Sequence, residues 1–281
     1  KQMQPETYRA LVAEETGGEV KPVLKELKLT SLPANEVLVK VHYSSLNYKD
    51  ALSATGNRGI TRKYPHTPGI DSCGTVVYSA NSQIQKGDKV LVCSYDLGMN
   101  TPGGFGQYIQ VPGDWVMPLP EGLGFRESMM LGTAGFTAAL AIYKMELNGQ
   151  HPDQGPVLVT GAGGGLGSLA INILSQSGYK VIAATGKTHE AGYFHQLGAE
   201  TIIDRTETND HSGKLLLRPR WAGAIDTVGG NILSTAIRAC QRHGNVASCG
   251  NALSPEFETS VFPFILNGIN LLGIDSATCP M

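Results

Sequence analysis

The pattern of hydrophobic and polar positions changes near the middle of the chain. In the first half, short runs rich in valine, leucine and tyrosine are separated by turn-forming glycine, proline and asparagine, a pattern typical of β-strands. The predicted strands are residues 8–14, 36–44, 74–78, 88–93, 107–111 and 115–119. Many short strands with turns between them predict a compact, barrel-like β domain over residues 1–126.

In the second half, strand-like runs alternate with segments of helical periodicity. Predicted strands 157–160, 180–184, 200–203, 224–226, 244–248 and 271–274 are interleaved with predicted helices 168–177, 189–197, 229–240 and 262–267. This alternation predicts an α/β fold, with a parallel, doubly wound Rossmann sheet over residues 127–281. A predicted helix over 127–145 joins the two halves.

A glycine-rich turn follows the first strand of the second half. It reads Gly161-Ala-Gly-Gly-Gly-Leu-Gly167 and leads into a predicted helix. A helix N-terminus has unpaired N–H groups and a partial positive charge, and glycines let a pyrophosphate come close to the backbone. Leu166 replaces the last glycine of a G-x-G-x-x-G motif, and Gly167 comes one place later. The position between a strand and a helix favours a dinucleotide site over an ordinary turn.

The end of the second predicted strand bears on the choice of coenzyme. It reads Ala184-Thr-Gly-Lys187, with no carboxylate before Glu190. Lys187 would attract the 2′-phosphate of NADP, Thr185 can hydrogen-bond it, and Arg205 follows the third strand as a second cation. We therefore predict a preference for NADPH over NADH. The alternative is that Lys187 is only a solvated surface charge.

Composition narrows the possible functions. The 281 residues carry a formal net charge of −2 and no run of basic residues, which argues against nucleic-acid binding. The five cysteines show neither C-x-x-C spacing nor a cluster with histidine, so no disulfide framework or metal site is expected. No secretory signal is visible, and the uncharged stretch 128–143 is too short and interrupted for a membrane span. We expect a soluble, cytoplasmic protein.

Several separate motifs carry a family resemblance. They are Ser44-Ser-Leu-Asn-Tyr-Lys-Asp50, Pro65-His-Thr-Pro-Gly-Ile-Asp71, Gly132-Thr-Ala-Gly-Phe-Thr-Ala-Ala139, Trp221-Ala-Gly-Ala-Ile-Asp-Thr-Val-Gly229 and Pro263-Phe-Ile-Leu266. The chain resembles the zinc-independent medium-chain dehydrogenase/reductases, in particular the group of acryloyl-CoA reductases and quinone oxidoreductases. The resemblance implies a catalytic domain, a coenzyme domain and a cleft between them. It also implies NADPH-dependent reduction of an activated C=C bond or a quinone.

The same resemblance implies that no metal takes part, because Ile70 stands where zinc-dependent relatives carry a histidine ligand. Members of the group normally continue for several dozen residues past the position of Met281, so we expect the C-terminal return to the catalytic domain to be missing. Asn251 departs from the apolar residue usual at its position. The coenzyme contacts that the resemblance implies are Tyr48, Gly163, Gly164, Gly165, Leu166, Thr185, Gly186, Lys187, Arg205, Asn251, Ile265 and Ser276.

Reduction of an α,β-unsaturated thioester requires donors for the developing enolate oxygen. Tyr48 and Asn47 are the expected catalytic donors, although Tyr48 also fits a structural tyrosine bonded to a backbone carbonyl. Lys49 and Asp50 fit a proton relay or a surface or interdomain ion pair. Asp71 fits either a catalytic acid or a buried acid that shapes a turn.

Arg62 and Lys63 fit either contacts to the phosphates of a CoA substrate or solvated charges. The expected partner is a small-molecule acceptor, with neither nucleic acid nor membrane. Three functions remain open: an NADPH-dependent acryloyl- or enoyl-CoA reductase, an NADPH:quinone or enone oxidoreductase, and a non-catalytic NADPH-binding protein. The predicted edge strand 271–274 also suggests a homodimer.

Overall fold

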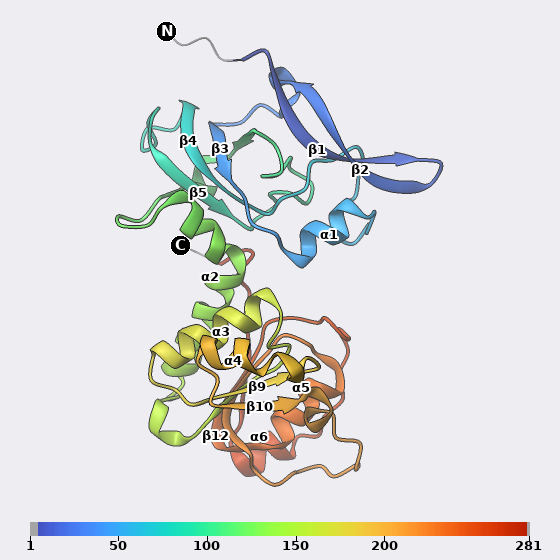
Figure 1. Ribbon diagram of the computed structural model, residues 1–281, viewed down its shortest axis with the longest axis vertical. Helices are drawn as coiled ribbons and strands as arrows, with labels where there is room; N and C mark the ends of the chain where they lie inside the picture. Colours follow the sequence, from blue (N-terminus) through green and yellow to red (C-terminus); the bar gives the residue numbers. More distant parts are fainter. Residues whose placement is uncertain (1–4, 280–281) are drawn as a thin grey trace. The chain divides into compact units, whose positions relative to one another are not determined.

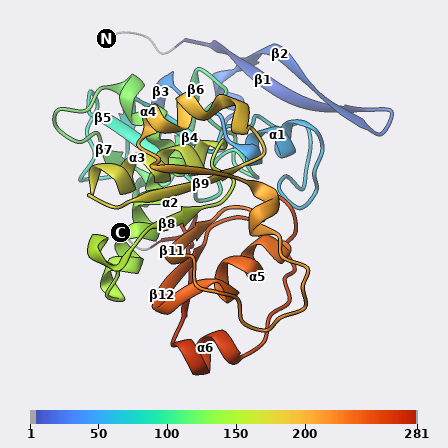
Figure 2. The same ribbon diagram turned by 60° about the horizontal axis from the view of Figure 1, so that its bottom comes forward.

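The computed structural model describes residues 5–279 (Figures 1 and 2). Contacts divide this chain into two compact units. The first contains the residues up to Thr133 together with those from Ala277 onward, and the second is Ala134–Ser276. The division lies within helix α2 (Phe125–Leu147), whereas the domain boundary predicted from the sequence, between residues 126 and 127, lies near the start of that helix.

The first unit is built on an antiparallel sheet of five strands. Its hydrogen-bonded order is β6-β3-β4-β5-β7. The strands are β3 (Val37–Tyr43), β4 (Asp71–Ser79), β5 (Lys89–Cys93), β6 (Tyr108–Val111) and β7 (Met117–Pro118), and a short 3₁₀ turn, η2 (Gly113–Trp115), precedes β7. Valine and isoleucine side chains from β3, β4, β5 and β6 form one buried cluster. The predicted β-rich first half is confirmed.

Two elements of the first unit have no counterpart in the sequence prediction. Strand β2 (Glu19–Lys28) pairs with β1 (Thr7–Thr16) in a separate hairpin and is followed by η1 (Leu29–Ser31). None of the β2 side chains is buried, and the strand contains Pro22, so its sequence lacks the usual strand signal. Helix α1 (Tyr48–Ala54) has only seven residues, too few to show helical periodicity.

The second unit contains a six-stranded parallel sheet. The strands are β8 (Val157–Val159), β9 (Val181–Thr185), β10 (Thr201–Asp204), β11 (Trp221–Asp226), β12 (Cys240–Ser248) and β13 (Asn270–Gly273). Their order is β10-β9-β8-β11-β12-β13, so the direction of winding reverses between β8 and β11. This is the strand order of a doubly wound dinucleotide fold, and the predicted α/β class is confirmed.

Helices cover both faces of this sheet. Val157 and Val159 pack with α2, α3 (Gly165–Gln176) and α4 (Ala191–Leu197), whereas Leu158 packs with α5 (Gly230–Arg238) and α6 (Phe262–Asn267). Three short 3₁₀ segments complete the connections: η3 (Pro152–Gln154), η4 (Thr188–Glu190) and η5 (Arg205–Thr208). Because both faces are covered, the central strands β8, β9 and β11 are apolar almost throughout. Among the described residues, no helix is long and apolar enough to cross a membrane.

Candidate functional site

The glycine-rich turn connects β8 to helix α3. The helix begins at Gly165, three residues earlier than predicted, with Gly164 as its N-cap. A Cβ on Gly167 would lie 2.4 Å from the carbonyl oxygen of Gly161 and 2.9 Å from the Cα of Ala162. Gly167 therefore permits the close packing of helix on strand that the last glycine of a dinucleotide fingerprint provides. The fingerprint is thus Ala162-x-Gly164-x-x-Gly167, and Gly167 was not among the residues expected at the coenzyme site.

The glycines at the tip of this turn are exposed. A Cβ on Gly163 would come no closer than 3.6 Å to another residue, and one on Gly165 no closer than 4.0 Å. Packing within the chain therefore does not require glycine at these two positions, whereas a ligand lying on the backbone would. The first N–H groups of α3 have no acceptor within the helix and carry its positive dipole end, which suits an anion. Leu166 is half-buried and its side chain packs against the core, which favours contact with a ligand through its backbone.

Two cations lie beside this turn. A Cβ on Gly163 would lie 3.8 Å from Thr185 Oγ1 and 4.0 Å from Lys187 Cδ, and one on Gly186 would lie 3.1 Å from Arg205 Nε. The structure therefore brings the glycine turn, the end of β9 and the start of η5 together. The Lys187 backbone N–H donates to Thr185 Oγ1 at 3.0 Å. Within the described chain, neither Lys187 nor Arg205 forms an ion pair.

The carboxylate nearest to Arg205 in the sequence is that of the preceding residue, Asp204. One oxygen of Asp204 accepts hydrogen bonds from the backbone N–H and the hydroxyl of Thr206, at 2.9 and 2.6 Å. These bonds lower the pKa of Asp204 and hold its carboxylate in its own turn. Asp204 therefore does not neutralise the two cations through an ion pair.

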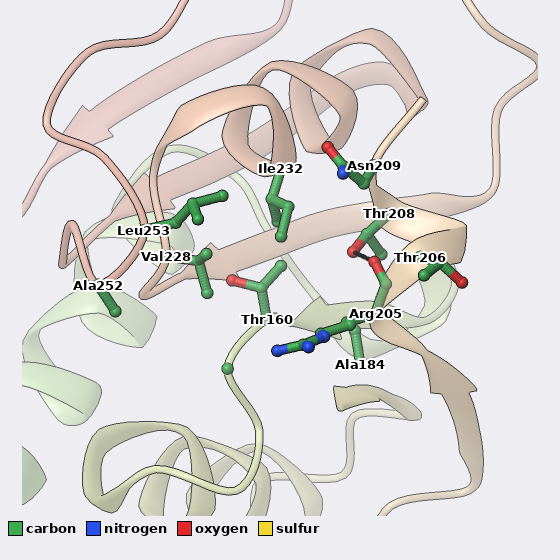
Figure 3. A pocket seen from close by; sticks show the side chains of 11 residues that line it. Thr160, Ala184, Arg205, Thr206, Thr208, Asn209, Val228, Ile232, Ala252 and Leu253 are labelled. Carbon is green, nitrogen blue, oxygen red and sulfur yellow. Dashed lines mark hydrogen bonds between the residues drawn. The ribbon is translucent and has the colours of Figure 1, made fainter. Parts of the chain in front are cut away.

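A cavity of about 530 Å³ opens at the carboxyl ends of the strands (Figure 3). It lies where the winding of the sheet reverses, the usual ligand position in such folds. Arg205 points across it toward Thr160, and apolar side chains including Val228 and Ile232 lie on the other side. None of its eleven described lining residues is acidic. They are Thr160, Gly161, Ala184, Arg205, Thr206, Thr208, Asn209, Val228, Ile232, Ala252 and Leu253.

A buried carboxylate fixes one wall of this cavity. Asp226, at the end of β11, is fully buried and accepts hydrogen bonds from Thr160 Oγ1 at 2.6 Å and from the Gly229 N–H at 2.7 Å. Burial raises its pKa above the usual value. Asp226 thus ties the end of β8 to the loop after β11. The sequence showed only an acid at the end of a strand, which gave no sign of this role.

Of the twelve residues expected to contact the coenzyme, Arg205 is the one found among the described residues that line the cavity. Three of the others come from the last part of the chain. Asn251 is exposed, although its neighbours Ala252 and Leu253 do line it. Ile265 is 68% exposed on α6. Ser276 shares a hydrogen bond of 2.6 Å with Thr137. The coenzyme roles of Asn251, Ile265 and Ser276 stay predictions.

The two expected catalytic donors lie at the start of α1, in the first unit. The Tyr48 side chain is 70% exposed, and its hydroxyl has no hydrogen-bond partner among the described residues. This arrangement does not favour the interpretation of Tyr48 as a structural tyrosine bonded to a carbonyl. The Asn47 amide donates to Asp71 Oδ2 at 2.9 Å, so its orientation is fixed by a buried acid.

Asp71 organises the backbone around these donors. Its carboxylate is fully buried and also accepts from the Thr133 N–H at 2.9 Å and the Thr133 hydroxyl at 2.5 Å. Gly132 interrupts α2 with φ +50°, and a Cβ there would lie 2.6 Å from Asp71 Oδ2. These contacts favour the turn-shaping interpretation of Asp71. The described residues contain no cluster of three or more metal-binding side chains.

Asp50 is buried and does not lie at the surface as one of its two expected roles required. Only 2% of Asp50 is exposed, and its carboxylate accepts from the backbone N–H groups of Ile70 and Asn47, at 2.9 and 2.8 Å. Burial raises its pKa. In the described chain Asp50 forms no ion pair with Lys49, so the surface-pair interpretation is wrong.

Comparison with known proteins places both units in one family. Residues 33–121 match the family model "Alcohol dehydrogenase GroES-like domain", and residues 165–279 match "Zinc-binding dehydrogenase". The acrylyl-CoA reductase AcuI of Ruegeria pomeroyi is 45% identical over 97% of this chain and 83% of its own length. A Bacillus subtilis relative with the provisional name quinone oxidoreductase YhfP is also 45% identical, over 98% of this chain and 83% of its own length.

Solved structures of relatives contain dinucleotides. The yhdH oxidoreductase of Salmonella enterica in complex with NADP superposes with a TM-score of 0.94 at 42% identity, covering 97% of this chain and 83% of that one. The Bacillus subtilis protein yhfP with NAD bound gives a TM-score of 0.95 at 44% identity, covering 99% and 84%.

Proposed function

The chain belongs to the medium-chain dehydrogenase/reductase family of oxidoreductases, and we propose that it reduces the activated C=C bond of an acryloyl- or enoyl-CoA thioester with NADPH. The observation that carries this proposal is the convergence of the glycine turn with Lys187 and Arg205 in a chain that is 45% identical to an acrylyl-CoA reductase. Quinone reduction is the second candidate, because an equally similar relative carries that name.

The residues of the second unit fit NADPH. The backbone of Gly163, Gly164, Gly165 and Leu166 would receive the pyrophosphate, because the three glycines are exposed and their turn leads into the positive end of α3. The cavity beside Arg205 would receive the adenosine. Thr185, Gly186, Lys187 and Arg205 would surround the 2′-phosphate, which requires cations and no facing carboxylate. When bound, NADPH supplies the hydride.

The first unit would supply the hydrogen-bond donors that stabilise the negative charge formed during the reaction. Negative charge develops on the thioester oxygen as the new C–H bond forms at the β-carbon, and hydrogen-bond donors aimed at that oxygen lower the barrier. The Tyr48 hydroxyl is the donor that no described residue already engages. The Asn47 amide retains a second N–H after its bond to Asp71 and would act beside it. The α-carbon then takes a proton from Tyr48 or water.

An acceptor screen with NADPH tests this proposal. We expect acryloyl-CoA to be reduced with a higher kcat/KM than 1,4-benzoquinone or a simple enone. Tyr48→Phe should lower kcat for acryloyl-CoA about 10- to 100-fold, the usual effect of losing one donor or proton source. Tyr193→Phe, at a half-exposed tyrosine of the second unit, is the matched control.

Each remaining outcome supports another function. A higher kcat/KM for the quinone would favour the quinone oxidoreductase. Tight NADPH binding with no oxidation by a thioester, an enone or a quinone would identify a non-catalytic NADPH-binding protein.

We also propose that the protein is a cytoplasmic homodimer. Strand β13 pairs with β12 on one side only, so its other edge is unpaired within the described sheet. A twofold copy would extend the sheet there, antiparallel across the axis. Sedimentation at micromolar concentration should show a dimer, and a monomer alone would reject this part of the proposal.

A further inference from the structure

We propose that Arg62 and Lys63 bind phosphoryl groups of the CoA portion of the substrate and thereby determine its specificity. This inference rests on the proposed function, since it concerns the same acceptor. Arg62 and Lys63 line a cavity of about 530 Å³ in the first unit, together with Asp96 and Asn100. Both side chains are exposed, and neither forms an ion pair within the described part of the chain.

The backbone that carries these cations is held in place. The Arg62 N–H donates to Asn100 Oδ1 at 3.2 Å, and the Arg62 carbonyl accepts from the guanidinium of Arg58 at 2.9 Å. The hydroxyl of Tyr64, the residue after Lys63, donates to the Ser53 carbonyl of α1 at 2.7 Å. The main chain is therefore fixed on both sides of the pair, while the two charged ends remain available to a ligand.

The acid in the same cavity, Asp96, forms no ion pair with Arg62 or Lys63 among the described residues. The two carboxylate oxygens of Asp96 accept hydrogen bonds from Asn100 Nδ2 at 2.9 Å and from Thr101 Oγ1 at 3.0 Å. Arg58, in the same segment, is a cation with a structural role. Its guanidinium contacts both carboxylate oxygens of Glu15 at 2.7 Å and lies over the ring of Tyr64. The contrast indicates that Arg62 and Lys63 are not used for folding.

The location suits the far end of a thioester. The segment that carries the cations is bonded to Ser53, near the end of α1, whereas Tyr48 begins that helix. Tyr64, the residue after Lys63, is therefore anchored toward the opposite end of α1 from Tyr48. A CoA thioester likewise separates its reacting carbon from its phosphoryl groups by the pantetheine arm. A quinone has no such anionic group and would not use these cations.

Steady-state kinetics with two thioesters tests the inference. Acryloyl-CoA carries phosphoryl groups, and acryloyl-pantetheine carries the same reacting group without them. For the double variant Arg62→Ala/Lys63→Ala, we expect KM for acryloyl-CoA to rise about 30-fold with kcat unchanged, a size reasonable for two exposed charge-assisted contacts. Parameters for acryloyl-pantetheine should stay within about twofold of wild type. Lys86→Ala, at an exposed lysine outside the cavity, is the control.

The failures of the two proposals are distinguishable. If wild type reduces both thioesters with equal kcat/KM, or if the double variant leaves KM for acryloyl-CoA unchanged, this inference is overturned and the thioester reductase stands. If wild type reduces neither thioester, the proposed function fails. Calorimetric titration with propionyl-CoA then decides the inference alone: binding that the double variant weakens about 30-fold supports it, and absent or unchanged binding overturns it.

Discussion

The preference for NADPH should depend on Arg205 and Lys187 together. We expect Arg205→Ala and Lys187→Ala each to weaken NADPH binding while leaving NADH binding nearly unchanged. The reason is that the two coenzymes differ only in the 2′-phosphate, which carries about −1.5 to −2 charges at pH 7. The double variant should bind the two coenzymes with similar affinity.

The exposure of the two side chains determines how much NADPH affinity each substitution is expected to cost. Hydrogen bonds to charged groups contribute about 1.5–3 kcal/mol when well shielded. Both side chains are exposed, so solvent and salt reduce that contribution to about 1–2 kcal/mol each. Because 1.4 kcal/mol corresponds to a factor of ten, each substitution should raise the Kd for NADPH about 5- to 30-fold. Arg205 extends into the cavity itself and should give the larger effect.

Calorimetric titration of each variant with NADPH and with NADH measures both Kd values directly. Lys180→Ala is a suitable control, because Lys180 is an exposed lysine of the same unit that does not line the cavity. Raising the ionic strength should narrow the difference between wild type and variants. Equal losses for NADPH and NADH, or wild type that binds NADH at least as tightly, would refute the reasoning.

Three further predictions concern stability, thiol reactivity and assembly. Gly167→Ala should lower the free energy of unfolding by about 2–4 kcal/mol, because the new methyl would lie 2.4 Å from the Gly161 carbonyl oxygen. Denaturant unfolding measures this change, and Gly192→Ala is the control, because there is open space around the Cβ at that position. Equal stability of the two variants would contradict the prediction. Burial raises the pKa of Cys240 and Cys249 to about 12. Both thiols should therefore resist iodoacetamide in the native protein at pH 8, and should react as the pH rises or after unfolding. Fast labelling of the native protein at pH 8, measured by mass spectrometry, would contradict this prediction. Leu271→Lys on strand β13 should shift a dimer toward monomer in sedimentation, and an unchanged dimer would place the interface elsewhere.

The elements of the second unit were predicted from the sequence more completely than those of the first. The central strands β8, β9 and β11 are buried almost throughout, so apolar runs mark them clearly, and the glycines and breaks between runs mark the helices. Boundaries were less accurate. Residue 240 was expected to end a helix, but α5 ends at Arg238 and Cys240 already pairs with Trp221 of β11. Local periodicity does not reveal where a neighbouring strand begins to supply hydrogen bonds.

The candidate site could be predicted only in part. The glycine turn, Lys187 and Arg205 follow local rules about strand ends and helix N-termini, and the structure does bring these segments together. The apolar wall of the cavity comes from residues such as Val228 and Ile232, which lie in separate loops and helices and share no local motif. The role of Asp226 also required the structure, and for Asp71 the hydrogen-bond partners were needed to favour the turn-shaping role over the catalytic one.

A crystal structure of the protein with NADP⁺ tests the central claim most directly. We predict the diphosphate on the N–H groups at the start of α3, the adenosine in the cavity beside Arg205, and the 2′-phosphate within hydrogen-bonding distance of Lys187 or Arg205. Adenosine bound at another place, or a 2′-phosphate that no cation contacts, would contradict the account.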